Sequence, residues 1–160
     1  MTAVFHRIGS YSRETFTNPI EQIQQYPGTV TFDGIYTSIW DNRDVIAEIA
    51  KEKPVILFAA GDTMGTEGFV TKQQLLTLVD EYDCLLAWHT WSHPDMTKLT
   101  DDEIRHELDA PSWFPRTTFA YPYGEFNDRV IELVKEAGYK SAYSTIQGND
   151  GVYSLYREYL

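Results

Sequence analysis

The clearest fold signal in this chain is the succession of PVILFAA at residues 54–60, TKQQ at residues 71–74 and CLLAWH at residues 84–89. The two apolar runs are short and rich in β-branched and aromatic residues, which is typical of buried strands. Thr71 and Gln74 have the spacing of a helix capping box, so a helix is expected between the two strands. A strand, a helix and a second strand in this order predict a parallel β–α–β unit.

The same alternation continues on both sides of this unit. Further strands are predicted at residues 3–6, 29–32, 117–121 and 140–144. Further helices are predicted to start near residues 17–20, to cover residues 41–51, to start at Thr100 and to run from about residue 127 to 138. Six parallel strands fit either a doubly wound sheet or a small distorted barrel, and both place functional residues at the carboxyl ends of strands.

Composition indicates one globular domain, residues 1–160. The 24 acidic and 13 basic residues give a net charge of −11, which disfavours nucleic acid and anionic membrane surfaces as partners. A single cysteine, Cys84, excludes an intrachain disulfide framework. The N-terminus has no basic and apolar leader pattern, and no run approaches the roughly 18 apolar residues of a membrane span. We therefore expect a cytoplasmic protein, and its oligomeric state is not predicted.

Polar and aromatic residues follow the predicted strands. The set comprises His6, Asp33, Asp62, His89 with His93, and the run Tyr121-Pro122-Tyr123-Gly124. A single histidine is more often structural than a ligand, but three of the four histidines fall in this set. Two imidazoles four residues apart, on a turn just past a strand, can bind one cation. His89 and His93 thus predict a divalent metal site, for zinc first and for nickel or cobalt as alternatives.

Three motifs resemble those of the polysaccharide deacetylases, carbohydrate esterase family 4. HTWSHP at residues 89–94 resembles the second family motif, in which both histidines bind a divalent metal. TFDG at residues 31–34 resembles the first motif, Thr-Phe-Asp-Asp-Gly, which places Asp33 at the catalytic base and Gly34 where a metal-binding aspartate stands. AYPYG at residues 120–124 resembles a third motif that lacks its usual arginine, and its match implies that the Tyr123 amide helps hold the oxyanion.

The two ends of the chain add to this resemblance. FHRI at residues 5–8 resembles the N-terminal strand of the circularly permuted biofilm-glycan de-N-acetylases, which implies the general-acid role for His6. EAGYKSAYST at residues 136–145 resembles the family's helix end and next strand, whereas the usual C-terminal Leu-x-His motif is absent. The resemblance implies an α/β fold, a distorted barrel of about six to seven parallel strands. His106 has no counterpart and is expected to face solvent or to pack.

The resemblance implies metal-dependent removal of an N-acetyl group from an amino sugar, in a surface polysaccharide or its precursor. Because catalytic zinc normally has three protein ligands and Gly34 has no side chain, Asp33 is expected either as the base or as the third ligand. Substrate contacts are expected from Tyr121, Pro122, Trp91 and Asp62, the last also as a spare ligand.

The sequence leaves two alternatives to this activity. The first is a catalytically impaired relative that binds carbohydrate or a partner protein. The second, a nucleotide-binding domain, is disfavoured because no strand-to-helix turn carries GxGxxG or GxxxxGKS.

Overall fold

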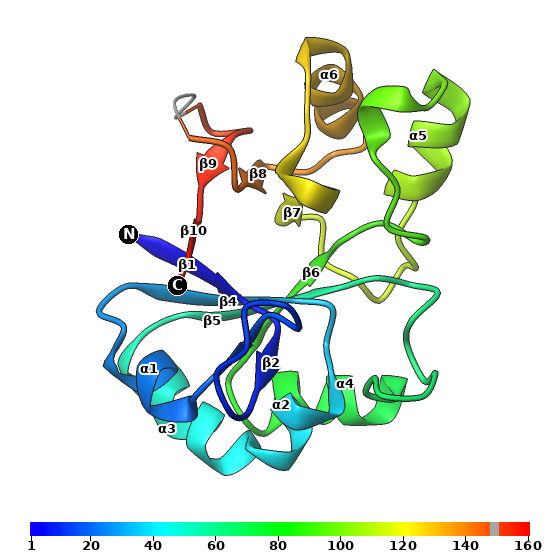
Figure 1. Cartoon of the computed structure of the whole chain (residues 1–160). Coiled ribbons are helices and arrows are strands. Elements are labelled where there is room, and N and C mark those ends of the chain that lie inside the picture. Colours follow the sequence, from blue (N-terminus) through cyan, green and yellow to red (C-terminus); the bar gives the residue numbers. More distant parts are fainter. Residues whose placement is uncertain (148–150) are drawn as a thin grey trace.

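A parallel sheet curved into a barrel is the centre of the molecule (Figure 1). The computed structural model describes residues 1–147 and 151–160. Its strands are β1 (Thr2–Phe5), β4 (Thr29–Asp33), β5 (Val55–Ala59), β6 (Leu85–Trp88), β7 (Thr118–Ala120), β8 (Ser141–Ser144), β9 (Leu155–Tyr156) and β10 (Glu158–Tyr159). They pair in the order β10-β1-β4-β5-β6-β7-β8-β9, and every pair is parallel. The six predicted strands are confirmed, and the barrel is the observed architecture.

The C-terminal segment connects the two edges of the sheet. β9 pairs with β8, β10 pairs with β1, and only Arg157 separates the two short strands. One extended segment therefore lies between the first and the last strand, which leaves neither edge of the sheet open. Sequence patterning did not predict this segment as a strand.

Helices surround the barrel and supply its outer layer. They are α1 (Ile20–Gln25), α2 (Thr37–Asp41), α3 (Arg43–Glu52), α4 (Lys72–Asp80), α5 (Asp101–Leu108) and α6 (Asp128–Glu136), with single 3₁₀ turns η1 (Met96–Lys98) and η2 (Pro122–Gly124). Both predicted capping boxes form, at Thr71 with Gln74 and at Thr100 with Glu103. A small parallel pair, β2 (Arg7–Ile8) and β3 (Thr17–Asn18), lies beside the barrel. None of the helices in the described ranges is long and apolar enough to cross a membrane.

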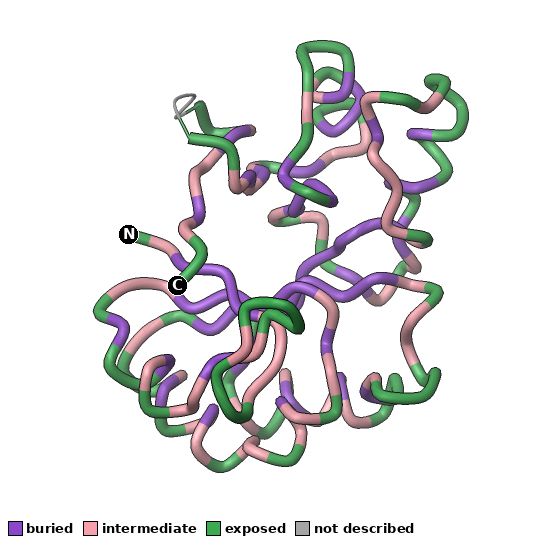
Figure 2. Tube along the Cα trace, viewed as in Figure 1, coloured by how far each residue is buried: buried purple, intermediate pink, exposed green. Residues whose placement is uncertain are grey.

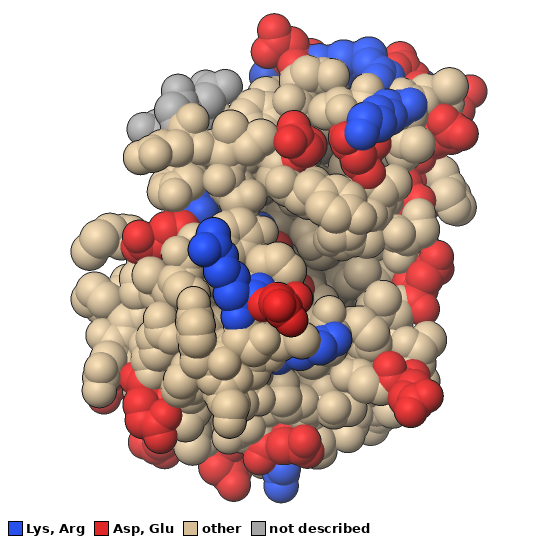
Figure 3. Space-filling model, in the orientation of Figure 1, with Lys and Arg blue, Asp and Glu red and all other residues tan. Residues whose placement is uncertain are grey.

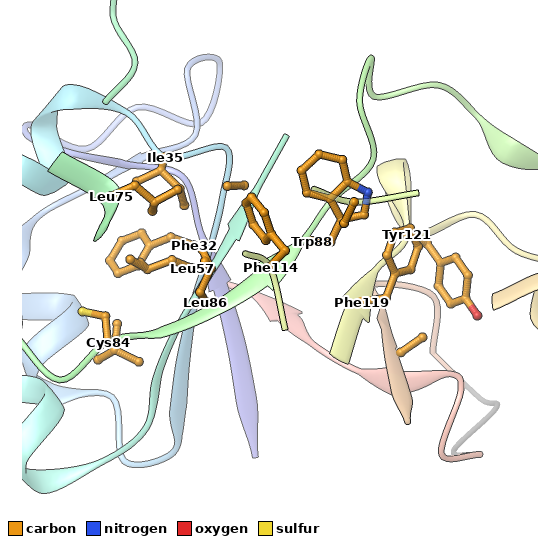
Figure 4. Close-up of a cluster of buried hydrophobic side chains, with 14 of the residues drawn as sticks. Phe32, Ile35, Leu57, Leu75, Cys84, Leu86, Trp88, Phe114, Phe119 and Tyr121 are labelled. Atoms are coloured by element: carbon orange, nitrogen blue, oxygen red, sulfur yellow. The ribbon is translucent and has the colours of Figure 1, made fainter. Parts of the chain in front are cut away.

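Alternation along the strands separates two apolar layers. Phe32, Leu57 and Leu86 face the helices in the main core, which also contains Cys84 (Figure 4). Phe58 and Ala87, one residue further along two of these strands, belong to a smaller cluster of the opposite face. Successive side chains of a strand point to opposite faces, which explains the two layers. Figure 2 shows the result, with buried residues concentrated on the strands and exposed ones on the outer helix faces.

Candidate active site

A cavity of about 340 Å³ lies at the carboxyl ends of the barrel strands. Its polar lining includes His6, Asp33, His89 and His93. Its aromatic lining consists of Phe16, Tyr36, Phe69, Tyr123 and Tyr159. Figure 3 shows that this view of the molecule is hollowed near its centre, with walls that are mostly uncharged. The arrangement suits a neutral, polar ligand whose rings or methyl groups can contact aromatic faces.

Asp33, the last residue of β4, forms a two-point ion pair with Arg157. The guanidinium donates from Nη1 to Oδ1 at 2.5 Å and from Nη2 to Oδ2 at 2.7 Å, and Nη1 also donates to the Thr31 hydroxyl at 3.0 Å. Arg157 is fully buried, with its charged group over the rings of Phe58 and Tyr143. Burial by itself would raise the pKa of Asp33, but the nearby charge of Arg157 holds it well below the usual range. The carboxylate is therefore ionised at neutral pH.

Arg157 is the functional residue that sequence analysis missed. One clue is present in the sequence: the third motif at residues 120–124 lacks the arginine of the family pattern, so an arginine from elsewhere in the chain could take its place. Nothing in the local sequence at residues 155–159 places a side chain of this segment inside the barrel.

His89 follows β6 and is buried against the same carboxylate. Its Nδ1 lies 2.7 Å from the carbonyl oxygen of Ala120. A carbonyl only accepts, so Nδ1 carries the proton and Nε2 presents its lone pair toward Asp33 Oδ2, at 3.7 Å. Burial lowers the pKa of His89 to about 4 against the opposing charge of Asp33. The imidazole is thus neutral and oriented as a metal-ligating histidine usually is.

His93 completes the histidine pair from a strained turn. Its ring centroid lies 4.8 Å from that of His89 and 4.7 Å from that of Tyr123. Thr90 and His93 have φ values of 70° and 58°, which side chains with a Cβ rarely adopt. Burial lowers the pKa of His93 as well. Two neutral imidazoles on one wall of the cavity provide two nitrogen donors for one cation.

His6 and Tyr123 lie on other walls of the cavity. The His6 ring follows β1 and stacks on Tyr159 at 6.1 Å between centroids, with Phe16 on another side at 5.2 Å. Burial lowers the pKa of His6, and the charge of Asp33 opposes that lowering. Tyr123 is 63% exposed and has a φ of 58°, followed by Gly124 at 73°. A Cβ at Gly124 would overlap the side chain of Thr145, so this turn requires glycine.

The donor set fits a divalent cation only in part. Among residues 1–147 and 151–160, no group of three His, Cys, Asp or Glu side chains is arranged to hold a metal ion. Both oxygens of Asp33 are already paired with Arg157, which argues against the predicted use of this carboxylate as a full third ligand. Gly34 leaves space at the motif position: a Cβ there would meet only Tyr36 at 3.5 Å and Phe69 at 3.6 Å.

None of the four residues predicted to contact substrate lines this cavity. Tyr121 is fully buried (Figure 4), and its hydroxyl donates to the Tyr153 carbonyl. Pro122, the next residue, is buried as well. The reason is strand alternation, which turns Tyr121 away from the barrel interior.

Trp91 belongs to the histidine turn itself, and Asp62 belongs to the neighbouring loop after β5. The Trp91 indole packs on Trp88 and donates to the Asp109 carbonyl, so it points toward the helical layer. Asp62 is exposed and its backbone N–H donates to the Trp91 carbonyl. His106 lies on the exposed side of α5, as expected.

Comparison with known sequences points to one family. A family model described as polysaccharide deacetylase matches residues 3–142. An uncharacterized 30.6 kDa protein from Geobacillus stearothermophilus is 27% identical over 124 residues, which cover 71% of this chain and 44% of that protein. Chitin deacetylase 1 of Cryptococcus neoformans var. grubii is 39% identical over 61 residues, 33% of this chain and 13% of that protein. The chain thus spans less than half the length of these curated relatives.

Solved structures share the fold over nearly the whole chain. The Streptococcus pyogenes deacetylase PplD in complex with acetate superposes with a TM-score of 0.82 at 17% identity, over 98% of this chain and 90% of that one. IcaB from Ammonifex degensii superposes with a TM-score of 0.76 at 17% identity, over 99% of this chain and 90% of that one. At these identities the likeness establishes the barrel architecture.

Proposed function

This chain belongs to the polysaccharide deacetylase family, and from that premise we propose that it hydrolyses the N-acetyl group of an amino sugar in a glycan or glycan precursor. The observation that carries the proposal is the meeting of Asp33, His6, His89 and His93 around one cavity. These residues come from three strand ends that are far apart in sequence, and they carry the roles that the motifs imply.

Asp33 is the proposed base. Amide hydrolysis requires a group that takes a proton from the attacking water, and the ionised, buried carboxylate is within the cavity for that purpose. Arg157 holds both of its oxygens, which fixes the carboxylate in place. The same pairing makes Asp33 a weaker base, so its contribution depends on geometry more than on proton affinity.

His6 is the proposed acid. As the C–N bond breaks, the amine nitrogen needs a proton, and the imidazolium form of His6 donates it, while the acyl part leaves as acetate. Burial lowers the pKa of His6, which makes the protonated ring a stronger acid, and the Asp33 charge limits that lowering. The exposed turn at Tyr123 presents its backbone N–H to the developing oxyanion, a donor of a kind worth about 3 kcal/mol in comparable sites.

Family members are generally metal-dependent, and the imidazoles of His89 and His93 are the groups that would hold a divalent cation here. Such an ion supplies Lewis acidity that polarises the acyl oxygen and acidifies water. With two imidazoles and no side chain at Gly34, we propose that this chain binds the metal more weakly than a three-ligand site.

Acetate release tests the proposal. Purified protein is incubated with N-acetylglucosamine oligomers after chelator treatment, and again with added Zn²⁺, Ni²⁺ or Co²⁺. We expect acetate to form with a metal present and to disappear in Asp33→Asn. Release that is equal in wild type and Asp33→Asn contradicts the assignment of the cavity. The cytoplasmic location stays a prediction.

A second candidate function follows from Gly34. Since the motif aspartate is absent there and Asp33 is paired with Arg157, the cavity can bind an N-acetylated sugar without hydrolysing it. Calorimetric binding of the same oligomers, with no acetate formed at any metal concentration, would favour this candidate.

A further inference from the structure

Glu107 is a buried carboxylate to which the proposed chemistry gives no role. It lies on the inner face of α5 and is 7% exposed. A carboxylate of this kind is stable in the interior only when hydrogen bonds replace its water. Its partners therefore indicate what it does.

Within the described residues, the side-chain oxygens of Glu107 accept hydrogen bonds from two residues of the segment between β6 and His93. Oε2 accepts the backbone N–H of Trp91 at 2.8 Å and that of Ser92 at 3.0 Å, and Oε1 accepts the Ser92 hydroxyl at 2.7 Å. The backbone carbonyl of Glu107 accepts the Trp88 indole N–H at 2.8 Å. One residue of α5 thus supports both ends of the segment that carries the histidine pair.

The turn at residues 90–93 depends on such support. Thr90 and His93 both have left-handed φ values, 70° and 58°, and neither is glycine. Strained conformations of this kind persist only where neighbouring contacts determine them. The Thr90 hydroxyl accepts the His93 N–H at 3.0 Å, while Glu107 accepts the two amides in between.

We propose that Glu107 is a positioning residue that holds the turn at residues 90–93 in its strained form, so that the His93 imidazole faces that of His89. The proposal rests on the proposed function only in that the imidazoles of His89 and His93 would serve there as metal ligands. The positioning itself is a property of the metal-free protein. Because the two N–H groups and the hydroxyl sit at fixed places, the reach of the side chain matters more than its charge.

Three substitutions distinguish the effect of the length of the Glu107 side chain from the effect of its charge. Glu107→Gln keeps all three bonds, since its amide oxygen can accept both N–H groups and its NH₂ can donate to the Ser92 hydroxyl. Glu107→Asp keeps the charge but is one methylene shorter, so it cannot reach both amides. Asp102→Asn is the control, because this carboxylate is on the same helix and its side chain is 97% exposed.

NMR of the metal-free protein reports the arrangement directly. We expect wild type, Glu107→Gln and Asp102→Asn to show the ring contact between His89 and His93 and slow amide exchange at Trp91 and Ser92. In Glu107→Asp the ring contact should weaken and both amides should exchange at least tenfold faster. Glu107→Ala should show a larger effect of the same kind if it folds, and Glu107→Asp decides the matter if it does not.

Co²⁺ titration provides a second readout, at a temperature where every variant is folded. Loss of a partner that orients a ligand typically costs 10–100-fold in metal affinity, which is the loss expected for Glu107→Asp. A Glu107→Asp protein that melts early but keeps the ring contact and the Co²⁺ affinity would overturn the proposal, because Glu107 would then only stabilise the fold. Wild-type protein that shows the ring contact but releases no acetate contradicts the proposed function and leaves the positioning role standing.

Discussion

Replacing Arg157 by methionine should strongly destabilise this protein. The change removes the two guanidinium nitrogens that donate to the Asp33 oxygens. It leaves the Asp33 carboxylate, in a residue that is only 6% exposed, with no counter-charge from Arg157. Removing one member of a buried ion pair usually destabilises a protein by about 3–5 kcal/mol, and we expect a loss of this size here. The Nε of Arg157 has no acceptor among the described residues, which favours the lower half of this range. For a chain of this length, about 3–5 kcal/mol corresponds to a fall in Tm of roughly 6–20 °C.

Urea denaturation followed by circular dichroism measures this change in the free energy of unfolding. Arg105→Met is the matched control, since Arg105 pairs with Asp102 at 3.2 Å and with Glu136 at 3.6 Å on the surface. Exposed pairs of this kind contribute about 0–1 kcal/mol, so the control should change stability little.

A second substitution identifies the cause. Arg157→Met combined with Asp33→Asn removes the buried charge as well, and should be less destabilised than the sum of the two single variants by about 1–3 kcal/mol. Strictly additive effects, or an Arg157→Met protein within 1 kcal/mol of wild type, would refute the ion pair as the element that ties the C-terminal segment to β4.

Four further outcomes are expected. His6→Gln should lower acetate release about 10²–10⁴-fold while leaving Tm and metal affinity near wild type, whereas an early-melting variant with an unchanged rate per folded molecule would assign His6 to packing. Combined substitution of His89→Ala and His93→Ala should abolish Zn²⁺ or Co²⁺ binding in calorimetric titration, and unchanged binding would remove the proposed site. Gly34→Asp should tighten Zn²⁺ binding at least about tenfold, because aspartate tolerates a left-handed φ and its Cβ would make only ordinary contacts with Tyr36 and Phe69 while its carboxylate adds a third ligand; weaker or equal binding contradicts that geometry. Because the pKa of Asp33 is lowered in the folded state, its stabilising effect is present above about pH 4 and is lost as pH falls toward the folded pKa, so the stability gap between wild type and Arg157→Met should narrow below about pH 4.

Most of the elements could be predicted because their signals are local. The strand at residues 55–59 is a continuous apolar run, and the helices after Thr71 and Thr100 begin with capping boxes that need only four adjacent residues. The histidine pair was found for the same reason, since a four-residue spacing after a strand is visible in the sequence itself.

The strand at residues 155–159 could not be predicted from its own residues. It consists of two pairs, Leu155–Tyr156 and Glu158–Tyr159, on either side of Arg157. The first pairs with the preceding strand, β8, but the second pairs with β1 at the other end of the chain. Strand pairing across such distances depends on which sheet edges the rest of the fold leaves open. Without this segment the sheet has open edges at β1 and β8, and β10 and β9 pair with them.

Sequence by itself determined six of the barrel's strands, most of its helices, the family motifs and the candidate residues His6, Asp33, His89 and His93, because each depends on neighbours within a few positions. Tertiary structure decided which side chains reach the cavity. It turned Tyr121 into the core, brought Arg157 across 124 positions to Asp33, and set Glu107 beneath the histidine turn. The physical reason is that a buried charge must find its partner wherever the closed barrel places one, and no local pattern encodes that meeting.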